Sequence, residues 1–401
     1  MISRRKFLGT GTAAAVSGAA GLAVGATSAS ALANTAAETK IADTVAHSVG
    51  RAKVPALGLH QAGVELELQS HTRFIALDIL PETDRRAMVR YMQLIADDIA
   101  RLANGEPVLA DPQPQLAQFA ARLTVTVGFG PSLFAKLGLE ASMPKGFAPL
   151  PAFDIDRLDP NLCDGDLLFQ ISCDDLPMLN HAARSLNRDS TSFATVRWSQ
   201  DGFANAQGVV GKGVRQRNMM GQVDGTDNPE LGSEDFANVV WMRDAQPWAN
   251  GGTQLVLRRI RMELGTWDTL GTEQKEQIIG RKLSNGAPIG GTNETDVPDF
   301  GARNEVGLHV IPDFAHIRNA AARDMKERFF RRPFNYVDGA TGETGLLWTA
   351  YSANLTEQYL PVQKRLAGGD LLNKWTTPVG SAVFVIPAGF DLNSYPGRGL
   401  F

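Results

Sequence analysis

The order of hydrophobic segments constrains the fold of this chain more than any other feature of its 401 residues. Short runs that are apolar or alternate in hydrophobicity predict strands, and longer runs with apolar residues three or four apart predict amphipathic helices. From residue 57 onward these patterns succeed one another as strand, helix, strand, strand, helix, strand. The predicted strands cover 72–80, 123–128, 165–172 and 193–198, and the predicted helices cover 84–102 and 175–186.

The second half of the chain repeats this order. Its predicted strands cover 254–262, 305–311, 346–352 and 382–387, and its predicted helices cover 267–279 and 356–366. Such an order is that of the ferredoxin-like unit, in which antiparallel strands carry helices on one face. No close sequence repeat accompanies it, so the duplication rests on element order alone. We predict an α+β protein of two ferredoxin-like domains, 57–213 and 214–401, whose antiparallel sheets can pack together around an apolar space.

The N-terminus has the pattern of an export signal. Arg4 and Arg5 precede a weakly apolar stretch rich in Ala and Gly, which closes on an Ala-x-Ala cleavage site. A transmembrane anchor is the alternative, but the many Gly, Ser and Thr residues disfavour it, and no other apolar run reaches about 18 residues. We predict a twin-arginine signal at 1–33, a flexible segment at 34–56, and a mature protein that is exported folded to the periplasm or the exterior, without a membrane span.

The net charge limits the classes of binding partner, and the cysteine content limits disulfides and metal sites. The formal net charge of −4 becomes about −7 without the three positive residues of the signal, which disfavours nucleic acid as a partner. Cys163 and Cys173 flank a predicted strand, and an extended segment of that length spans roughly 33 Å, too far for a disulfide unless the chain turns. We therefore predict unpaired cysteines, and a zinc or iron–sulfur site is excluded for want of ligands.

The segment 217–229 places one carboxylate between glycines. It reads Arg-Asn-Met-Met-Gly-Gln-Val-Asp-Gly-Thr-Asp-Asn-Pro. Glycine lets a backbone approach a flat ligand closely, and the two methionines are polarizable. Asp224 could thus be presented from a loop over the face of a cofactor. The alternative is an ordinary surface turn, because Asp-Gly is a common turn pair.

This segment resembles the Gly-x-x-Asp-Gly signature of dye-decolourising peroxidases, in the longer form Arg-Asn-x-Met-Gly-x-x-Asp-Gly-Thr-x-Asn-Pro. Stretches at 58–63, 165–170 and 279–288 resemble further elements of that family in the same order, so the resemblance covers about 57–401. It points to the exported twin-arginine subgroup, which is related to deferrochelatases. It implies a fold like a dimeric α+β barrel, haem b held mainly by the C-terminal domain, and hydrogen peroxide and organic electron donors as substrates.

The resemblance also implies roles for single residues. Asp224 would be the distal acid and base toward peroxide. The residues implied to line the haem in this part of the chain are Gly221, Val223, Gly225, Thr226 and Arg281.

Peroxidases hold haem iron with a neutral imidazole. Among six histidines, His316 lies in the stretch 311–319, which resembles the family's segment with the iron ligand, and His309 is the alternative. A carboxylate that accepts the other ring N–H would make the imidazole a stronger donor. The carboxylates near enough in sequence to do so are Asp313, Asp324 and Glu327, and the sequence does not choose among them.

Two adjacent arginines follow. Alone they would be a solvated basic turn, but in the family the first of a paired arginine supplies the distal cation, which makes Arg331 the candidate and Arg332 the alternative. Pro333 stands where the family usually has glycine, and this stiffens the loop. Leu347 and Trp348 resemble the strand that closes the distal pocket, where phenylalanine is usual in place of the tryptophan; plain core packing is the alternative.

Together these residues predict a haem peroxidase. Asp224 would move the peroxide proton, Arg331 would stabilise the charge that develops as the O–O bond breaks, and His316 would bind the iron. Because a carboxylic acid titrates at lower pH than the histidine of other peroxidases, activity should favour mildly acidic pH. Release of iron from haem, as in deferrochelatases, and a haem carrier without turnover are the alternative functions. The physiological reductant and assembly into a homo-oligomer stay open.

Overall fold

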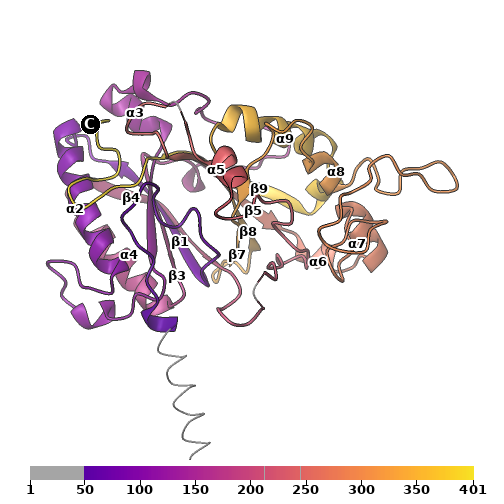
Figure 1. Ribbon diagram of the computed structural model, residues 1–401, viewed down its shortest axis with the longest axis horizontal. Coiled ribbons are helices and arrows are strands. Elements are labelled where there is room, and N and C mark those ends of the chain that lie inside the picture. The colour runs from indigo at the N-terminus through magenta and orange to yellow at the C-terminus, as the bar shows by residue number, and fades with distance from the viewer. Residues whose placement is uncertain (1–48, 212, 244) are drawn as a thin grey trace, which may run out of the picture. The chain divides into compact units, whose positions relative to one another are not determined.

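The N-terminal half forms the predicted strand–helix–strand–strand–helix–strand unit (Figure 1). The computed structural model describes residues 49–211, 213–243 and 245–401; the predicted signal at 1–33 and the first part of the predicted lead-in, 34–48, lie outside the described residues. The main elements are β1 (His71–Ile79), α2 (Arg85–Ala103), β2 (Thr124–Phe129), β3 (Leu167–Cys173), α4 (Leu176–Ser190) and β4 (Ala194–Phe203). Shorter helices are η1 (Pro114–Ala117), α3 (Pro131–Leu137), η2 (Glu140–Ser142) and η3 (Pro160–Leu162).

The C-terminal half repeats the unit with additional short elements. Its strands are β5 (Thr253–Met262), β6 (Phe330–Arg331), β7 (Phe334–Val337), β8 (Thr344–Ser352) and β9 (Thr376–Ile386). Its helices are α5 (Glu234–Val240), α6 (Leu264–Trp267), α7 (Thr272–Ile279), α8 (His316–Ala320), α9 (Leu355–Gly369) and η4 (Leu371–Lys374). The helix predicted at 267–279 is therefore broken, because the chain is extended at Gly271 before α7 begins.

The strand predicted at 305–311 is wrong. This segment belongs to a loop that folds back on itself through one isolated bridge, between Arg303 and His309. Val306 and Leu308 are 78% and 65% exposed, so the alternation that suggested a strand has no sheet to pack against. In the described part of the chain, β7 takes the place of the predicted strand in the sheet.

The strands of both halves join into one antiparallel sheet. Its order is β5-β9-β2-β3-β1-β4-β7-β8-β6, and an additional pairing of β5 with β8 closes the sheet on itself. Within each half the order, β2-β3-β1-β4 and β9-β5-β8-β7, is that of a ferredoxin-like unit. The halves meet at two short seams, where Phe129 pairs with Val385 and Phe203 pairs with Asn335. The predicted α+β, barrel-like arrangement of two such units is confirmed.

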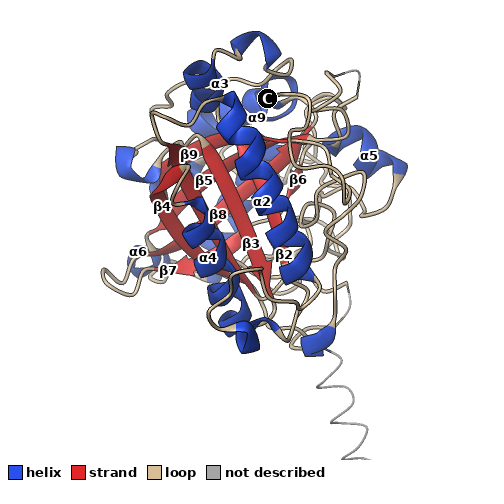
Figure 2. Cartoon of the chain, turned by 90° about the vertical axis from the view of Figure 1, so that its left-hand side faces the viewer, coloured by secondary structure: helices blue, strands red, loops and turns tan. Residues whose placement is uncertain are grey.

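Helices cover the outer side of the closed sheet. Asp84 starts α2 by accepting a hydrogen bond from the N–H of Ala87, and the apolar side of the helix, including Met88 and Ile95, is buried in the large core of the N-terminal half. Figure 2 shows α2 in front of the sheet, where it packs on β2 and on α4. In the C-terminal half α9 packs on β5 and β8, and α8 packs on α9. This helical layer beside β8 positions the site described below.

Two further predictions concern the pairing of the cysteines and the presence of a membrane span. Cys163 and Cys173 are both buried and free, which confirms that they are unpaired. Among the described residues, no helix has both the length and the apolar character needed to cross a lipid bilayer.

Candidate active site

The segment 217–228 folds back on itself and carries Asp224. Arg217 pairs with Val223 in an isolated antiparallel bridge. Within the turn between them, the side-chain oxygen of Asn218 accepts hydrogen bonds from two backbone N–H groups, at 3.0 and 3.2 Å. Asp224 is half-buried, and its carboxylate has no hydrogen-bond partner among the residues that the structure describes. The loop therefore presents a carboxylate that is free to act on a ligand.

Arg331 lies against this loop at the end of β6. The side chain of Asn228 bonds to both backbone groups of Arg331: its Nδ2 donates to the carbonyl at 2.7 Å, and its Oδ1 accepts from the N–H at 3.0 Å. Gln216 donates a further bond from the loop to the carbonyl of Pro333, at 2.7 Å. The Nε of Arg331 is buried without a partner in the described part of the chain. Loop and strand thus bring Asp224 and an unpaired cationic donor into one region.

Arg332 is directed elsewhere. It is 1% exposed, and its guanidinium donates to backbone carbonyls of segment 66–69 at 3.2 Å and to the side chain of Gln69 at 2.5 Å. Burial lowers its pKa to about 10. Arg332 continues the pairing with β8 through its N–H, which donates to the carbonyl of Thr349 at 3.1 Å, and its side chain points away from that of Arg331 because successive residues of an extended segment alternate in direction. The geometry therefore favours Arg331 over Arg332 as the distal cation.

His316 begins α8, and a carboxylate holds its ring. Its Nδ1 lies 2.6 Å from Oδ2 of Asp370, a side chain 3% exposed that follows the end of α9. Burial lowers the pKa of His316, but the charge and the hydrogen bond of Asp370 outweigh it, and the pKa is raised above its ordinary value. The bond at Nδ1 leaves Nε2 as the nitrogen that can bind a metal.

The three carboxylates suggested by proximity in sequence are engaged elsewhere, so none of them is the partner of His316. Asp313 bonds to His309 at 2.8 Å, Glu327 bonds to an arginine of α9 at 2.8 Å, and Asp324 caps its own turn. The correct partner, Asp370, comes 54 residues after the histidine. The same contacts place His309 on an exposed loop with its ring already paired.

Charge effects and a shared apolar cluster place His316 in the region of Asp224 and Arg331. The charges of these two residues both act on the pKa of His316, Arg331 lowering it and Asp224 raising it. One third of the His316 side chain, 33%, is accessible, so the ring is not enclosed by packed core. Trp348 packs against the same apolar cluster as Met220 of the Asp224 loop. The predicted ligand, acid and cation therefore share one site.

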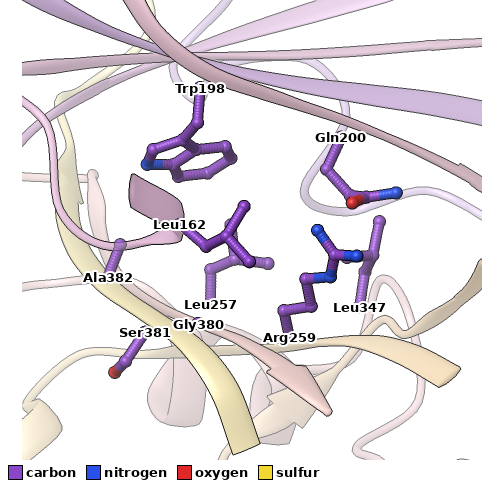
Figure 3. Close-up of a pocket in the computed structure, with 9 residues that line it drawn as sticks. All are labelled: Leu162, Trp198, Gln200, Leu257, Arg259, Leu347, Gly380, Ser381 and Ala382. Atoms are coloured by element: carbon purple, nitrogen blue, oxygen red, sulfur yellow. The ribbon is translucent and has the colours of Figure 1, made fainter. Parts of the chain in front are cut away.

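The two predicted haem contacts on β8 point to opposite faces, as successive strand residues do. Trp348 lies with Leu346 on the side of α9 and of the site. Leu347 points to the inner side of the sheet, where it lines a small pocket together with Trp198 (Figure 3). The structure thus brings Trp348 to the site but not Leu347, and Leu346 is the leucine of this strand on the correct face.

The stretch after α7 supports the site from another side. Gly280 has φ +89°, and a Cβ there would lie 2.6 Å from the side chain of Ile317, the neighbour of His316. The backbone can come this close to α8 only because the residue is glycine. Arg281 donates from Nη1 to two backbone carbonyls at 2.8 Å, and burial lowers its pKa. Arg281 thus stabilises this stretch, and the positive charge of Arg331 also lowers its pKa.

The remaining predicted residues all lie in the Asp224 loop. Gly221 and Gly225 each have φ +86°, the left-handed backbone that favours glycine. Val223 packs beside the glycine-rich stretch after α7. The hydroxyl of Thr226 donates to the carboxylate of Glu294 at 2.9 Å, so its side chain stabilises the loop.

Known proteins resemble this chain over most of its length. The family models described as Dyp-type peroxidase, N-terminal and C-terminal, match residues 61–204 and 215–391. A dye-decolorizing peroxidase from Thermobifida fusca (strain YX) is 35% identical over 358 residues, 85% of this chain and 83% of that protein. The chain belongs to the Dyp-type peroxidase family. A deferrochelatase from Yersinia pseudotuberculosis is 33% identical over 371 residues, 87% of this chain and 85% of the relative.

The fold of this Dyp-type peroxidase has close solved counterparts. The crystal structure of a DyP-type peroxidase from Cellulomonas bogoriensis is 44% identical and superposes with a TM-score of 0.85, covering 88% of this chain and 99% of the other. Family and fold together confirm three predictions: the resemblance to dye-decolourising peroxidases, the peroxidase class of enzyme and haem as the cofactor. The site fits that cofactor, because the ring of His316 is held through Nδ1 and is partly accessible, and the guanidinium of Arg331 has a buried Nε without a partner among the described residues.

Proposed function

We propose that this chain binds haem b between His316 on one side and Asp224 and Arg331 on the other, reduces hydrogen peroxide, and oxidises organic donors such as dyes or phenols. The observation that carries the proposal is the convergence of three groups: a histidine fixed through Nδ1 by Asp370, a carboxylate without a partner, and an arginine Nε without a partner. When bound, haem would supply the two electrons that reduce the O–O bond of peroxide and would recover them from the organic donors. A haem carrier would have no use for the acid and the cation.

Each side chain proposed to lie around the bound peroxide has a different role. His316 offers Nε2 to the iron while Asp370 holds the proton on Nδ1. Asp224, as a carboxylate, accepts the proton of one peroxide oxygen and returns it to the other, which leaves as water. Arg331 stabilises the negative charge that develops on the leaving oxygen. Trp348 keeps bulk water from that side of the site.

Stopped-flow reaction of the haem-loaded protein with peroxide tests these roles. Asp224→Asn should slow the bimolecular reaction by about 10²- to 10⁴-fold, because it removes a positioned acid and base. Arg331→Leu should slow it by about 10²- to 10³-fold, because it removes an oxyanion-type donor. Asp227→Asn is the matched control, an exposed acid of the same loop, and should react like the wild type. Unchanged rates in the first two variants, or no Soret band after haem loading, would sink the proposal.

The alternative function is release of iron from haem. The relatives named deferrochelatase favour it, since they match almost the same share of the chain as the peroxidase relative. Incubation with haem followed by extraction of the pigment distinguishes the two activities, because deferrochelatase action leaves iron-free porphyrin. We expect the extracted pigment to be intact haem, under conditions in which the same protein turns over peroxide at an easily measured rate. Iron-free porphyrin as the main product would make iron release the principal activity.

We further propose that residues 1–33 direct export of the folded protein by the twin-arginine route, to the periplasm or the exterior. The support is the sequence itself, with Arg4 and Arg5 ahead of an Ala/Gly-rich stretch. Replacing both arginines by lysine should retain the full-length chain inside the cell. Continued export of a shortened chain by that variant would contradict the proposed route.

A further inference from the structure

Asn228 holds Arg331 by its backbone. The Asn228 amide makes a donor bond of 2.7 Å and an acceptor bond of 3.0 Å, both to the same residue. This pair of bonds is the pattern that a neighbouring strand would make with an extended residue. Here one side chain takes the place of that strand.

Arg331 has few other restraints. Its strand, β6, has only two residues, and β8 pairs with it on one side, where Arg331 lies opposite Ala350. Asn228 occupies the other side. The guanidinium adds no restraint through Nε, which is buried and unpartnered among the described residues. The direction of the side chain therefore depends on how firmly the backbone is held.

The same asparagine closes the turn that follows Asp224. Its own N–H donates to the carbonyl of Gly225 at 3.1 Å. Gly225 has φ +86°, and a Cβ on it would come within 3.2 Å of Asn228 Nδ2. The turn is thus shaped so that its last residue reaches Arg331. One residue fixes both members of the distal pair, which lie 107 positions apart in the chain.

We propose that Asn228 is a positioning residue that sets the place of Arg331 relative to Asp224, and so controls the binding of peroxide and of small anions on the distal side of the haem. The inference rests on the proposed function of this site. Asn228 does not touch the substrate; it acts through the two groups that do. A displacement of about 1 Å in such a group can change a rate by about 100-fold.

The fold supplies a matched control. Asn335 also donates from its side chain to the Asp224 loop, to the carbonyl of Arg217 at 3.2 Å, but among the described residues its side chain makes no hydrogen bond to the turn after Asp224 or to Arg331. Loss of either asparagine removes hydrogen bonds between the same two segments. Asn228→Ala removes two such bonds and Asn335→Ala removes one, so both variants should lower Tm, while only the first should change the binding of ligands at the haem.

Fluoride binding to the ferric protein, followed by its absorption shift, gives a readout that is independent of turnover. We expect Asn228→Ala to raise the fluoride Kd and to lower the bimolecular rate with peroxide by about 10- to 100-fold, with little change in kcat for a dye at saturating peroxide. Asn335→Ala should keep the wild-type Kd and peroxide rate. Equal fluoride affinity and peroxide rates in the two variants would overturn the inference.

Asn228→Asp adds a test by pH. As a carboxylate it still accepts from the N–H of Arg331 but repels the carbonyl, whereas the protonated acid can donate to that carbonyl again. Its fluoride affinity should therefore approach the wild-type value in acid and fall to that of Asn228→Ala at neutral pH, with the two variants compared at each pH. A ratio between them that does not change with pH counts against the inference. If instead Arg331→Leu has no effect on fluoride or peroxide, the proposed function fails first.

Discussion

Replacement of Asp370 by asparagine changes its charge but keeps its shape. Oδ2 of Asp370 accepts from Nδ1 of His316 at 2.6 Å, and Oδ1 accepts from the N–H of Leu372 at 2.9 Å. Asparagine has only one acceptor oxygen. If that oxygen stays with Leu372, the NH₂ group faces Nδ1 and forces the ring proton onto Nε2, the nitrogen needed for iron. If the amide turns round, its NH₂ opposes the N–H of Leu372.

The first orientation keeps a hydrogen bond to the ring but reverses its direction, which blocks the ligand nitrogen, and the second orientation loses the buried hydrogen bond to Leu372. Loss of such an outer partner of a metal-binding histidine lowers affinity by about 10- to 100-fold. That range corresponds to about 1.4–2.7 kcal/mol of binding free energy. We therefore expect Asp370→Asn to weaken haem binding by this amount, with an altered ferric spectrum, while the far-UV circular dichroism stays that of the wild type.

Titration of the apoprotein with haem, followed at the Soret band, measures the affinity. Asp313→Asn is the control, because Asp313 makes the same type of bond to a histidine, at 2.8 Å to His309, but its side chain is 78% exposed. That variant should bind haem like the wild type. An Asp370→Asn protein with wild-type affinity and spectrum would refute the reasoning, and a loss in the Asp313 variant instead would move the iron ligand to His309.

Three further predictions concern the rest of the fold. Burial and a neighbouring carboxylate raise the pKa of Asp98 to about 8. The protonated side chain therefore stabilises the fold in acid, and this contribution is lost as pH rises from about 4 to about 8, by at most about 1.4 kcal/mol per pH unit. Between pH 5 and 8.5 the free energy of unfolding in urea should fall less for Asp98→Asn than for the wild type, and an equal fall would contradict the assignment. Cys163 and Cys173 are buried and free, so a thiol reagent should label neither in the native protein and both in urea; labelling before unfolding would show that they are accessible. Gly280→Ala should lower the free energy of unfolding by about 1–3 kcal/mol, since φ is +89° there, whereas Gly265→Ala, which meets open space, should change it little; similar Tm values for the two variants would argue against the close approach.

Where local patterns decide the structure, the sequence was enough to predict it. The helix at α2 has an Asp84 cap and a continuous apolar face, and β3 is a wholly buried run, so both were found within a few residues. The segment 305–311 has the alternation of a strand, but whether alternation produces a strand depends on a neighbour that only the folded chain supplies. Four-residue β7, which does fill that place, is too short to show a period.

The same distinction holds for the site. Asp224 was found because its loop is a long local motif, and His316 because its segment resembles one. Asp370 was missed because its only local signal is that of a residue after the end of a helix, with Oδ1 on the N–H two residues on. Its function comes from a contact with a histidine 54 residues away, and no pattern within either segment encodes that contact.

The adjacent arginines show why the site needs both halves of the chain. Arg331 turns to the site in the C-terminal half, and Arg332 inserts into segment 66–69 of the N-terminal half, where its guanidinium makes three hydrogen bonds. Because the two residues share a peptide bond, the N-terminal half holds the strand from which Arg331 projects. A C-terminal half produced alone, 214–401, would leave Arg332 without these partners and the closed sheet without its two seams. We expect that fragment to fail to retain haem, even though the proposed ligand, acid and cation all lie within it; addition of the N-terminal half in trans should restore a Soret band if the seams re-form.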